Sequence, residues 1–291
     1  MKLIETKIFV CSLILMILFV NIFDNFFESF TNQLLFFLIP LIWPGIAHGS
    51  LDIEIAQRKK IINSIRDKIL FVSSYLLIIG LFFSLWVNYN DIVFTLFIIL
   101  SILHFGISDK LGNDSLANFL EIFIRGTIVI SLPLRFHTEK TIEVFSYFQI
   151  SNSLVNNFIT VNEFIVFFVL LIIIMWLVLS YRQNNKNLLQ ILLEFILLFF
   201  CFTYFEPLIS FLIYFCFLHS TRHLIIEKDN LSFSYKEIFL KTIPLTFLTT
   251  VIITATFINS DHSIFNYIYL ILVGISSLTI PHIFLVNFTK N

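Results

Sequence analysis

Charged side chains are scarce in this chain of 291 residues. Asp, Glu, Lys and Arg make up only 13% of it, against roughly a quarter in soluble globular domains. Hydrophobic residues account for 58%, 38 of them are Phe, and the mean hydropathy is +0.94. This composition has too few polar residues to cover the solvent-exposed surface of a domain folded in water. The sequence therefore excludes a soluble globular protein and predicts one that crosses a membrane several times.

Basic charge and cysteine are also in short supply. The 18 Lys and Arg are offset by 19 Asp and Glu, for a net charge of −1, so no basic face is available and we expect no nucleic-acid partner. The three cysteines, Cys11, Cys201 and Cys216, lie within apolar runs and show no C-x-x-C spacing. They predict buried thiols rather than a cysteine metal site.

Apolar runs long enough to span a bilayer, about 20 residues each, follow one another along the whole chain. Backbone polar groups inside lipid must bond within their own segment, which favours helices over open strands. We therefore expect an all-α, polytopic transmembrane helical bundle of about ten spans. Residues 188–205 and 207–226 are alternatively one re-entrant unit, so the expected number is eight to ten. The ten candidates are residues 8–23, 34–56, 69–88, 92–108, 117–135, 162–180, 188–205, 207–226, 237–258 and 264–288.

Basic residues near the ends of the spans orient the chain. With ten spans and a cytoplasmic N-terminus, fourteen Lys and Arg fall on the cytoplasmic side, and only Arg135 and Lys140 fall on the other. This bias predicts a multi-pass protein of the cell (inner or plasma) membrane with both termini in the cytoplasm. The first apolar run has no small-x-small cleavage site, so we expect it to remain as a helix.

The seven histidines separate by their expected depth in the membrane. His137 and His262 fall in outer loops, where an imidazole is solvated. Ionisable side chains within lipid are costly and normally face the interior of a bundle. Five at a similar depth predict one shared polar site rather than separate helix-to-helix hydrogen bonds. These five lie in spans or at their cytoplasmic ends: His48, His104, His219, His223 and His282.

Their spacing indicates a metal centre. His219 and His223 are four residues apart, on one face of a helix, from which two imidazoles can bind one ion. Asp52 follows His48 by one turn and is expected to hold the other N–H of that ring, while Pro44 and Gly45 predict a kink just before it. Four neutral imidazoles suit iron, zinc or copper.

A facial triad, with Asp52 or Glu194 supplying one oxygen, is the competing scheme of ligands. Glu194 is expected deep in the membrane, either accepting a hydrogen bond from a ligand histidine or protonated and structural. Arg222 is expected to reach the lipid headgroups or an acidic partner. Asp109, at the membrane edge after His104, and His282 are further candidates for supporting the ligands.

Four segments in this order resemble the Brp/Blh family of bacterial and archaeal membrane β-carotene 15,15′-dioxygenases, over about residues 38–288. They are Gly45-Ile-Ala-His48-Gly49-Ser-Leu-Asp52, Ser101-Ile-Leu-His104-Phe105-Gly106-Ile-Ser-Asp109, Tyr214-Phe-Cys-Phe-Leu-His219-Ser-Thr-Arg222-His223 and Pro281-His282.

The resemblance implies that O₂ cleaves the central double bond of β-carotene to give two molecules of all-trans-retinal. It further implies a non-haem Fe(II) held by His48, His104, His219 and His223. The implied surroundings are membrane lipid, with a retinal-binding rhodopsin as recipient of the product.

The resemblance also divides the chain into an N-terminal anchor helix and loop, residues 1–33, and a catalytic transmembrane domain, residues 34–291. Two alternatives stay open. A membrane desaturase or hydroxylase also uses clustered histidines, but typically more of them and with adjacent pairs, which this chain lacks. A non-catalytic factor for retinal-protein assembly would use its buried polar groups without a metal.

Overall fold

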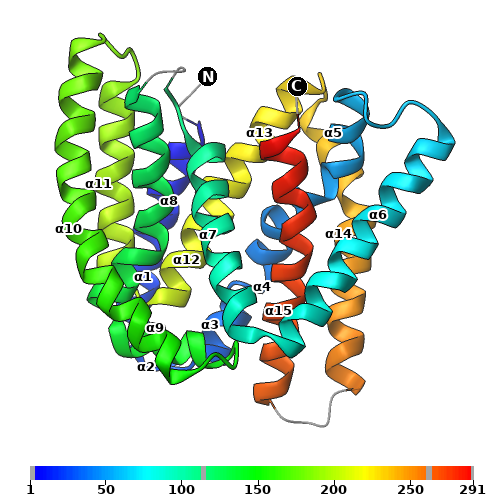
Figure 1. Cartoon of the computed structure of the whole chain (residues 1–291), viewed down its shortest axis with the longest axis horizontal. Coiled ribbons are helices and arrows are strands. Elements are labelled where there is room, and N and C mark those ends of the chain that lie inside the picture. Colours follow the sequence, from blue (N-terminus) through cyan, green and yellow to red (C-terminus); the bar gives the residue numbers. More distant parts are fainter. Residues whose placement is uncertain (1–3, 113–115, 260–263, 290–291) are drawn as a thin grey trace. The chain divides into compact units, whose positions relative to one another are not determined.

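The structure, a computed structural model, describes residues 4–112, 116–259 and 264–289 (Figure 1). The chain is 88% helical, and no strand occurs in these residues. Eight helices within them are long and apolar enough to cross a membrane. Phe30–Phe36 and Leu38–Arg58, bent by 59° at their junction, form either a broken span or a re-entrant loop, and Leu188–Tyr204 is a shorter apolar helix. The expected all-α, polytopic architecture is confirmed.

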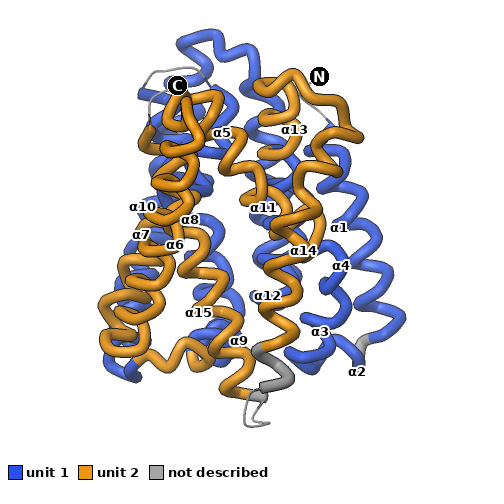
Figure 2. The backbone as a smooth tube through the Cα atoms, turned by 90° about the vertical axis from the view of Figure 1, so that its right-hand side faces the viewer, with its two compact units in different colours: residues 1–40, 101–145, 151–222 blue, residues 41–100, 146–150, 223–291 orange. Residues whose placement is uncertain are grey.

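The chain forms two compact units, which Figure 2 distinguishes by colour. Unit 1 comprises residues 1–40, 101–145 and 151–222, and unit 2 comprises residues 41–100, 146–150 and 223–291. The division passes through helix α7 (Asn90–Asp109) and through α13 (Thr221–Asn230). The units are therefore interleaved along the sequence.

Unit 1 is built on helix α8, which is largely buried and packs against α10 and α11 (Figure 1). The Asn162 side chain of α10 donates to the carbonyl of Ser131 on α8 at 3.0 Å. The elements of this unit, besides parts of α7 and α13, are α1 (Ile4–Ile22), α2 (Asp24–Phe27), α3 (Phe30–Phe36), α4 (Leu38–Pro40), α8 (Leu116–Phe136), α9 (Thr138–Ser146), α10 (Asn152–Arg182), α11 (Leu188–Tyr204), α12 (Pro207–Tyr214) and the π-helical turn η3 (Phe215–Ser220).

Two glycines let α7 and α8 approach each other closely in unit 1. A Cβ atom on Gly106 would lie 2.2 Å from the carbonyl oxygen of Ile122, and one on Gly126 would lie 1.9 Å from that of Ile102. Backbone atoms therefore occupy the space of any larger side chain, as at small-residue contacts between membrane helices. This contact fixes the part of α7 that carries His104, because His104 lies between Ile102 and Gly106 in the sequence.

Unit 2 surrounds an apolar cluster that joins its short and long helices. Leu51, Ile55, Leu224, Ile238 and Leu285 are buried together there. The elements of this unit, besides parts of α7 and α13, are the π-helical turn η1 (Leu41–Gly45), the 3₁₀ turn η2 (Ile46–Leu51), α5 (Asp52–Arg58), α6 (Ile65–Asn88), α14 (Tyr235–Asn259), α15 (Ile264–Ile283) and the π-helical turn η4 (Phe284–Phe288).

The helix breaks just before His48, as Pro44 and Gly45 predict. Trp43 has an extended backbone (φ −142°, ψ 118°), and the chain continues through η1 and η2 before regular α-helix resumes at Asp52. Proline removes a backbone donor and clashes with the preceding turn, which accounts for the break. His48 therefore lies on an irregular segment, as functional residues of membrane helices often do.

The long helices expose apolar side chains instead of a polar face. Only 17% of the apolar window of α10 and 6% of that of α6 is buried, and Phe164, Ile174 and Leu77 are each more than 60% exposed. Apolar surface this extensive would aggregate in water, whereas lipid solvates it. The exposed faces therefore support the membrane-spanning assignment.

We predict that Gly126→Ala destabilises the protein, because the added methyl group must displace the backbone at Ile102. Overpacking of this kind costs about 1–3 kcal/mol, so the apparent melting temperature in detergent should fall. Gly80→Ala on α6 is the matched control, since no atom lies within 4 Å of a Cβ placed there. Equal melting temperatures for the two variants would contradict the close contact between α7 and α8.

Candidate metal centre

Unit 1 contributes a pair of buried imidazoles, His104 on α7 and His219 in η3. Their ring centroids are 5.0 Å apart, and each ring offers a nitrogen within 4.8 Å of one on the other. Aromatic rings adjoin the pair: the Phe105 centroid lies 4.9 Å from that of His219, and Phe215 stacks on His219 at 5.9 Å. The pair is therefore close enough to bind one ion and has apolar neighbours.

Asp109 fixes the orientation of His219. Its Oδ1 lies 3.2 Å from His219 Nδ1, and its Oδ2 accepts a 2.7 Å hydrogen bond from the Tyr214 hydroxyl. A carboxylate only accepts, so the hydrogen of the neutral ring sits on Nδ1 and the lone pair is left on Nε2. This pairing of carboxylate and imidazole is the usual second partner of a metal-binding histidine.

A buried ionic network continues from Asp109. Arg222 donates through Nη1 to the Asp109 backbone carbonyl at 2.9 Å and through Nη2 to Glu194 Oε1 at 2.6 Å. Glu194 Oε2 accepts from Arg125 Nη1 at 2.7 Å, and Arg125 Nε donates to Glu121 Oε1 at 2.7 Å. All five side chains are at most 2% exposed. The network therefore links α7, α8, α11 and α13 beside the imidazole pair.

The carboxylates of this network outnumber its guanidinium groups. Asp109, Glu121 and Glu194 carry three negative charges when ionised, and Arg125 and Arg222 carry two positive charges. An unbalanced charge is costly in an apolar interior. A cation held at His219 would therefore be stabilised by the excess negative charge.

Unit 2 contains a second group of buried imidazoles, His48, His223 and His282. The ring centroids of His48 and His282 are 5.0 Å apart, those of His223 and His282 are 5.4 Å apart, and those of His48 and His223 are 5.6 Å apart. The rings meet edge to face. Three imidazoles at these separations form a nitrogen-rich cluster from three separate segments of unit 2.

Asp52 orients His282 in the same way that Asp109 orients His219. His282 Nδ1 donates to Asp52 Oδ1 at 2.8 Å, and the Tyr75 hydroxyl donates to Asp52 Oδ2 at 2.7 Å. Both units therefore contain a Tyr–Asp–His arrangement in which the phenol fixes the carboxylate and the carboxylate fixes the imidazole. Lys59 ties α5 to η4, because its ammonium group donates to the Leu285 and Val286 carbonyls.

His48 is oriented by its own backbone. Its Nδ1 donates to the carbonyl oxygen of Gly45, one turn earlier on the irregular segment. A carbonyl oxygen cannot donate, so the hydrogen lies on Nδ1 and the lone pair again lies on Nε2. We expected Asp52 to hold His48, whereas its carboxylate contacts His282 and Tyr75.

The expected supporting residues also find defined partners. Of the two roles expected for Arg222, the structure shows the acidic partner, Glu194. Glu194 in turn accepts from arginines and from the Thr6 hydroxyl, a role that we did not predict. His137 bonds the Thr203 carbonyl at 3.0 Å, and His262 lies outside the described residues.

Sequence reasoning missed three hydroxyl groups: Tyr214, Tyr75 and Thr6. Tyr214 stands in a motif that we quoted, five residues before His219, and its position there was an available signal. Tyr75 lies in a long apolar run, 23 residues from Asp52, and Thr6 stands between Glu5 and Lys7, 188 residues from Glu194. Nothing in a single sequence pairs residues that distant.

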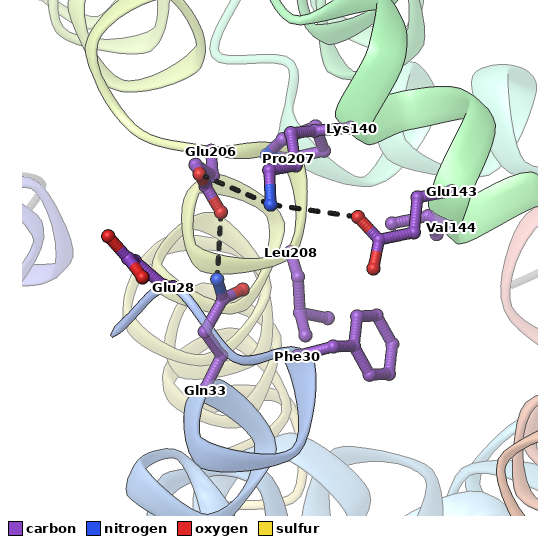
Figure 3. A pocket seen from close by; sticks show the side chains of 9 residues that line it. All are labelled: Glu28, Phe30, Gln33, Lys140, Glu143, Val144, Glu206, Pro207 and Leu208. Carbon is purple, nitrogen blue, oxygen red and sulfur yellow. Dashed lines mark hydrogen bonds and ion pairs between the residues drawn. The ribbon is translucent and has the colours of Figure 1, made fainter. Parts of the chain in front are cut away.

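A pocket at the other end of α12 in unit 1 does not suit a hydrocarbon ligand. Figure 3 shows Gln33 bonded to Glu206, and Lys140 between Glu206 and Glu143. The cavity measures only about 10 Å³, which is room for roughly one water molecule. Its carboxylates and small size make it a polar surface feature, separate from the imidazoles.

Comparison with known proteins identifies the family. A family model described as beta-carotene 15,15′-dioxygenase matches residues 39–290. The beta-carotene 15,15′-dioxygenase of uncultured marine bacterium 66A03 is 27% identical over 258 residues, which cover 85% of this chain and 90% of that protein. No solved structure gives a significant match. The resemblance inferred from the histidine motifs is thus confirmed, and the chain belongs to the β-carotene 15,15′-dioxygenase family.

Proposed function

We propose that this protein cleaves the central 15,15′ double bond of β-carotene with O₂ and releases two molecules of all-trans-retinal. The metal is a non-haem Fe(II) held by His48, His104, His219 and His223. The observation that carries the proposal is the set of buried imidazoles at the family's motif positions, two of them, His48 and His219, with Nδ1 bound to an oxygen acceptor. In this tautomer the lone pair that a metal ion requires is on Nε2.

One continuous helix supports assigning the four histidines to a single ion. The segment Pro207–Asn230 carries His219, which lies with His104 in unit 1, and His223, which lies with His48 in unit 2. Residues four apart share a helix face. The His-x-x-x-His spacing therefore supports, on sequence grounds, our proposal that His219 and His223 bind the same ion.

The nearby carboxylates favour all-imidazole ligation over a facial triad. Both oxygens of Asp52 are engaged, by His282 and Tyr75. Both oxygens of Glu194 are engaged as well, by arginines and Thr6. A carboxylate whose oxygens already accept strong hydrogen bonds is a poor additional ligand. Neutral nitrogen donors alone suit Fe(II) and leave its positive charge to be offset by the ionic network of unit 1.

When bound, the iron would activate O₂, because triplet oxygen by itself does not react readily with an alkene. The chain's own task is positioning and exclusion of water. Phe105 and Phe215 flank the unit 1 imidazoles and keep their surroundings apolar. β-Carotene has no ionisable group, so its binding must come from apolar contact, and we propose that it enters laterally from the lipid. An elongated Phe-lined cavity beside the histidines stays a prediction.

The cellular setting of the proposal follows from its chemistry. β-Carotene is a hydrocarbon and retinal is a largely apolar aldehyde, and both dissolve in the bilayer, so a multi-pass enzyme of the cell membrane meets them there. We propose that both termini face the cytoplasm and that a retinal-binding rhodopsin takes up the product. An assembly factor without catalytic activity would contain the same helices but would need no metal.

We predict that Ala at His48, His104, His219 or His223 abolishes retinal formation and lowers bound iron. Each substitution removes one of the four proposed nitrogen donors. The wild-type chain, expressed in β-carotene-accumulating bacteria, should remove the orange colour and produce retinal, which chromatography measures. His137→Ala is the control and should stay active, because its ring bonds the Thr203 carbonyl and His137 is not one of the proposed ligands. A wild-type chain that yields no retinal would reject the enzyme in favour of the assembly factor.

We also predict that Asp109→Asn and Asp52→Asn reduce activity about 10–100-fold, the usual effect of losing a partner of a metal ligand. An amide binds the imidazole N–H more weakly and leaves the ring less basic. Asp67→Asn is the matched control, because that carboxylate is only partly buried and accepts from the Asn63 backbone at the start of α6. If the Asp109→Asn variant has full activity and normal iron content, the proposed role of Asp109 in supporting His219 is contradicted.

A further inference from the structure

Helix α1 lies outside the part of the chain that matches the family, yet it is an integral part of unit 1. The family match begins at residue 39, whereas α1 spans Ile4–Ile22 and contacts η3, α11 and α12. One face of the helix is buried: Glu5, Thr6, Phe9, Ser12, Leu13 and Met16. Two of these side chains, Glu5 and Thr6, are polar groups at the very start of the helix. A helix that served only as a lipid anchor would not need to bury them.

Thr6 joins the ionic network directly. Its hydroxyl donates to Glu194 Oε1 at 2.7 Å, the same oxygen that accepts from Arg222 Nη2 at 2.6 Å. Glu5 lies beside the same guanidinium group, with Oε1 3.7 Å from Arg222 Nε. The first turn of α1 therefore contacts both members of the Arg222–Glu194 ion pair.

The contacts continue from that ion pair to the imidazole. Arg222 Nη1 donates to the Asp109 backbone carbonyl at 2.9 Å, and Asp109 Oδ1 holds His219 Nδ1 at 3.2 Å. All the side chains along this path are at most 2% exposed. In such surroundings, loss of one donor to a buried carboxylate is not replaced by water, and the ion pair must rearrange.

We propose that α1 is a positioning element of the metal centre, acting through Thr6, and to a lesser extent Glu5, on the Arg222–Glu194 pair and so on Asp109 and His219. The inference rests on the proposed function, because it takes His219 to be an iron ligand. Helix α1 then raises the affinity of the protein for Fe(II), in addition to anchoring the chain.

The test uses the full-length protein, purified in detergent, stripped of metal and titrated with Fe(II) without oxygen. Thr6→Val removes the hydroxyl while keeping the shape of the side chain, and it should weaken iron binding about 10-fold or more. Thr6→Ser keeps the hydroxyl and should restore binding. Ser12→Ala is the matched control, because this buried hydroxyl of the same helix bonds only the Phe9 carbonyl of its own turn.

Melting of the metal-free variants separates positioning from general stability. Thr6→Val and Ser12→Ala should melt within a few degrees of each other, while only Thr6→Val loses affinity for iron. If Thr6→Val fails to fold, Glu5→Gln gives the same test and should weaken iron binding by a smaller factor. Wild-type affinity for iron in the folded variant, or equal losses in the Thr6 and Ser12 variants, would overturn the proposal.

The two hypotheses fail in different ways. A wild-type protein that binds no Fe(II) contradicts the proposed metal centre itself. A wild-type protein that binds Fe(II) and forms retinal, next to a Thr6→Val variant of unchanged affinity, contradicts only the role of α1.

Discussion

The arrangement of unit 1 depends on the cost of burying charge in an apolar bundle. Arg125 and Arg222 are almost completely buried, so each must face carboxylates, and Glu194 bridges them. Breaking such a pair on one side leaves a buried charge without compensation, which costs about 3–5 kcal/mol. The network therefore specifies how its helices pack, and it places Asp109 where it can hold His219.

In both units a tyrosine and an aspartate orient one imidazole. In unit 1 the chain of contacts is Tyr214–Asp109–His219, and in unit 2 it is Tyr75–Asp52–His282. The tyrosine occupies one carboxylate oxygen and thereby keeps the other directed at the ring. In an environment without water, these three groups satisfy one another, and the lone pair of each imidazole remains on Nε2. His282 is therefore oriented by the same kind of contacts as the proposed ligand His219.

The sequence was sufficient to predict the fold class and the burial of five histidines, because depth in a membrane and helical spacing are one-dimensional properties. Pro44 and Gly45 likewise predicted the break before His48, since the effect of proline is local. The partners of the polar groups were less predictable. Asp52 is one turn from His48 in sequence, yet it bonds His282, 230 residues away. Thr6 reads as an ordinary residue of an apolar helix until packing brings it to Glu194. These pairings are set by helix packing, which hydropathy and spacing do not encode.

The central claim is that one iron ion is held by imidazole nitrogens alone, and X-ray absorption spectroscopy of the Fe(II)-loaded protein tests it most directly. Our account predicts a first shell of nitrogen or oxygen atoms at about 2.0–2.2 Å, the range of metal–nitrogen bonds in related sites. It also predicts the outer-shell scattering of about four imidazole rings, reduced by one ring in the His219→Ala variant. A first shell dominated by carboxylate oxygens or cysteine sulfur, without imidazole scattering, would contradict it.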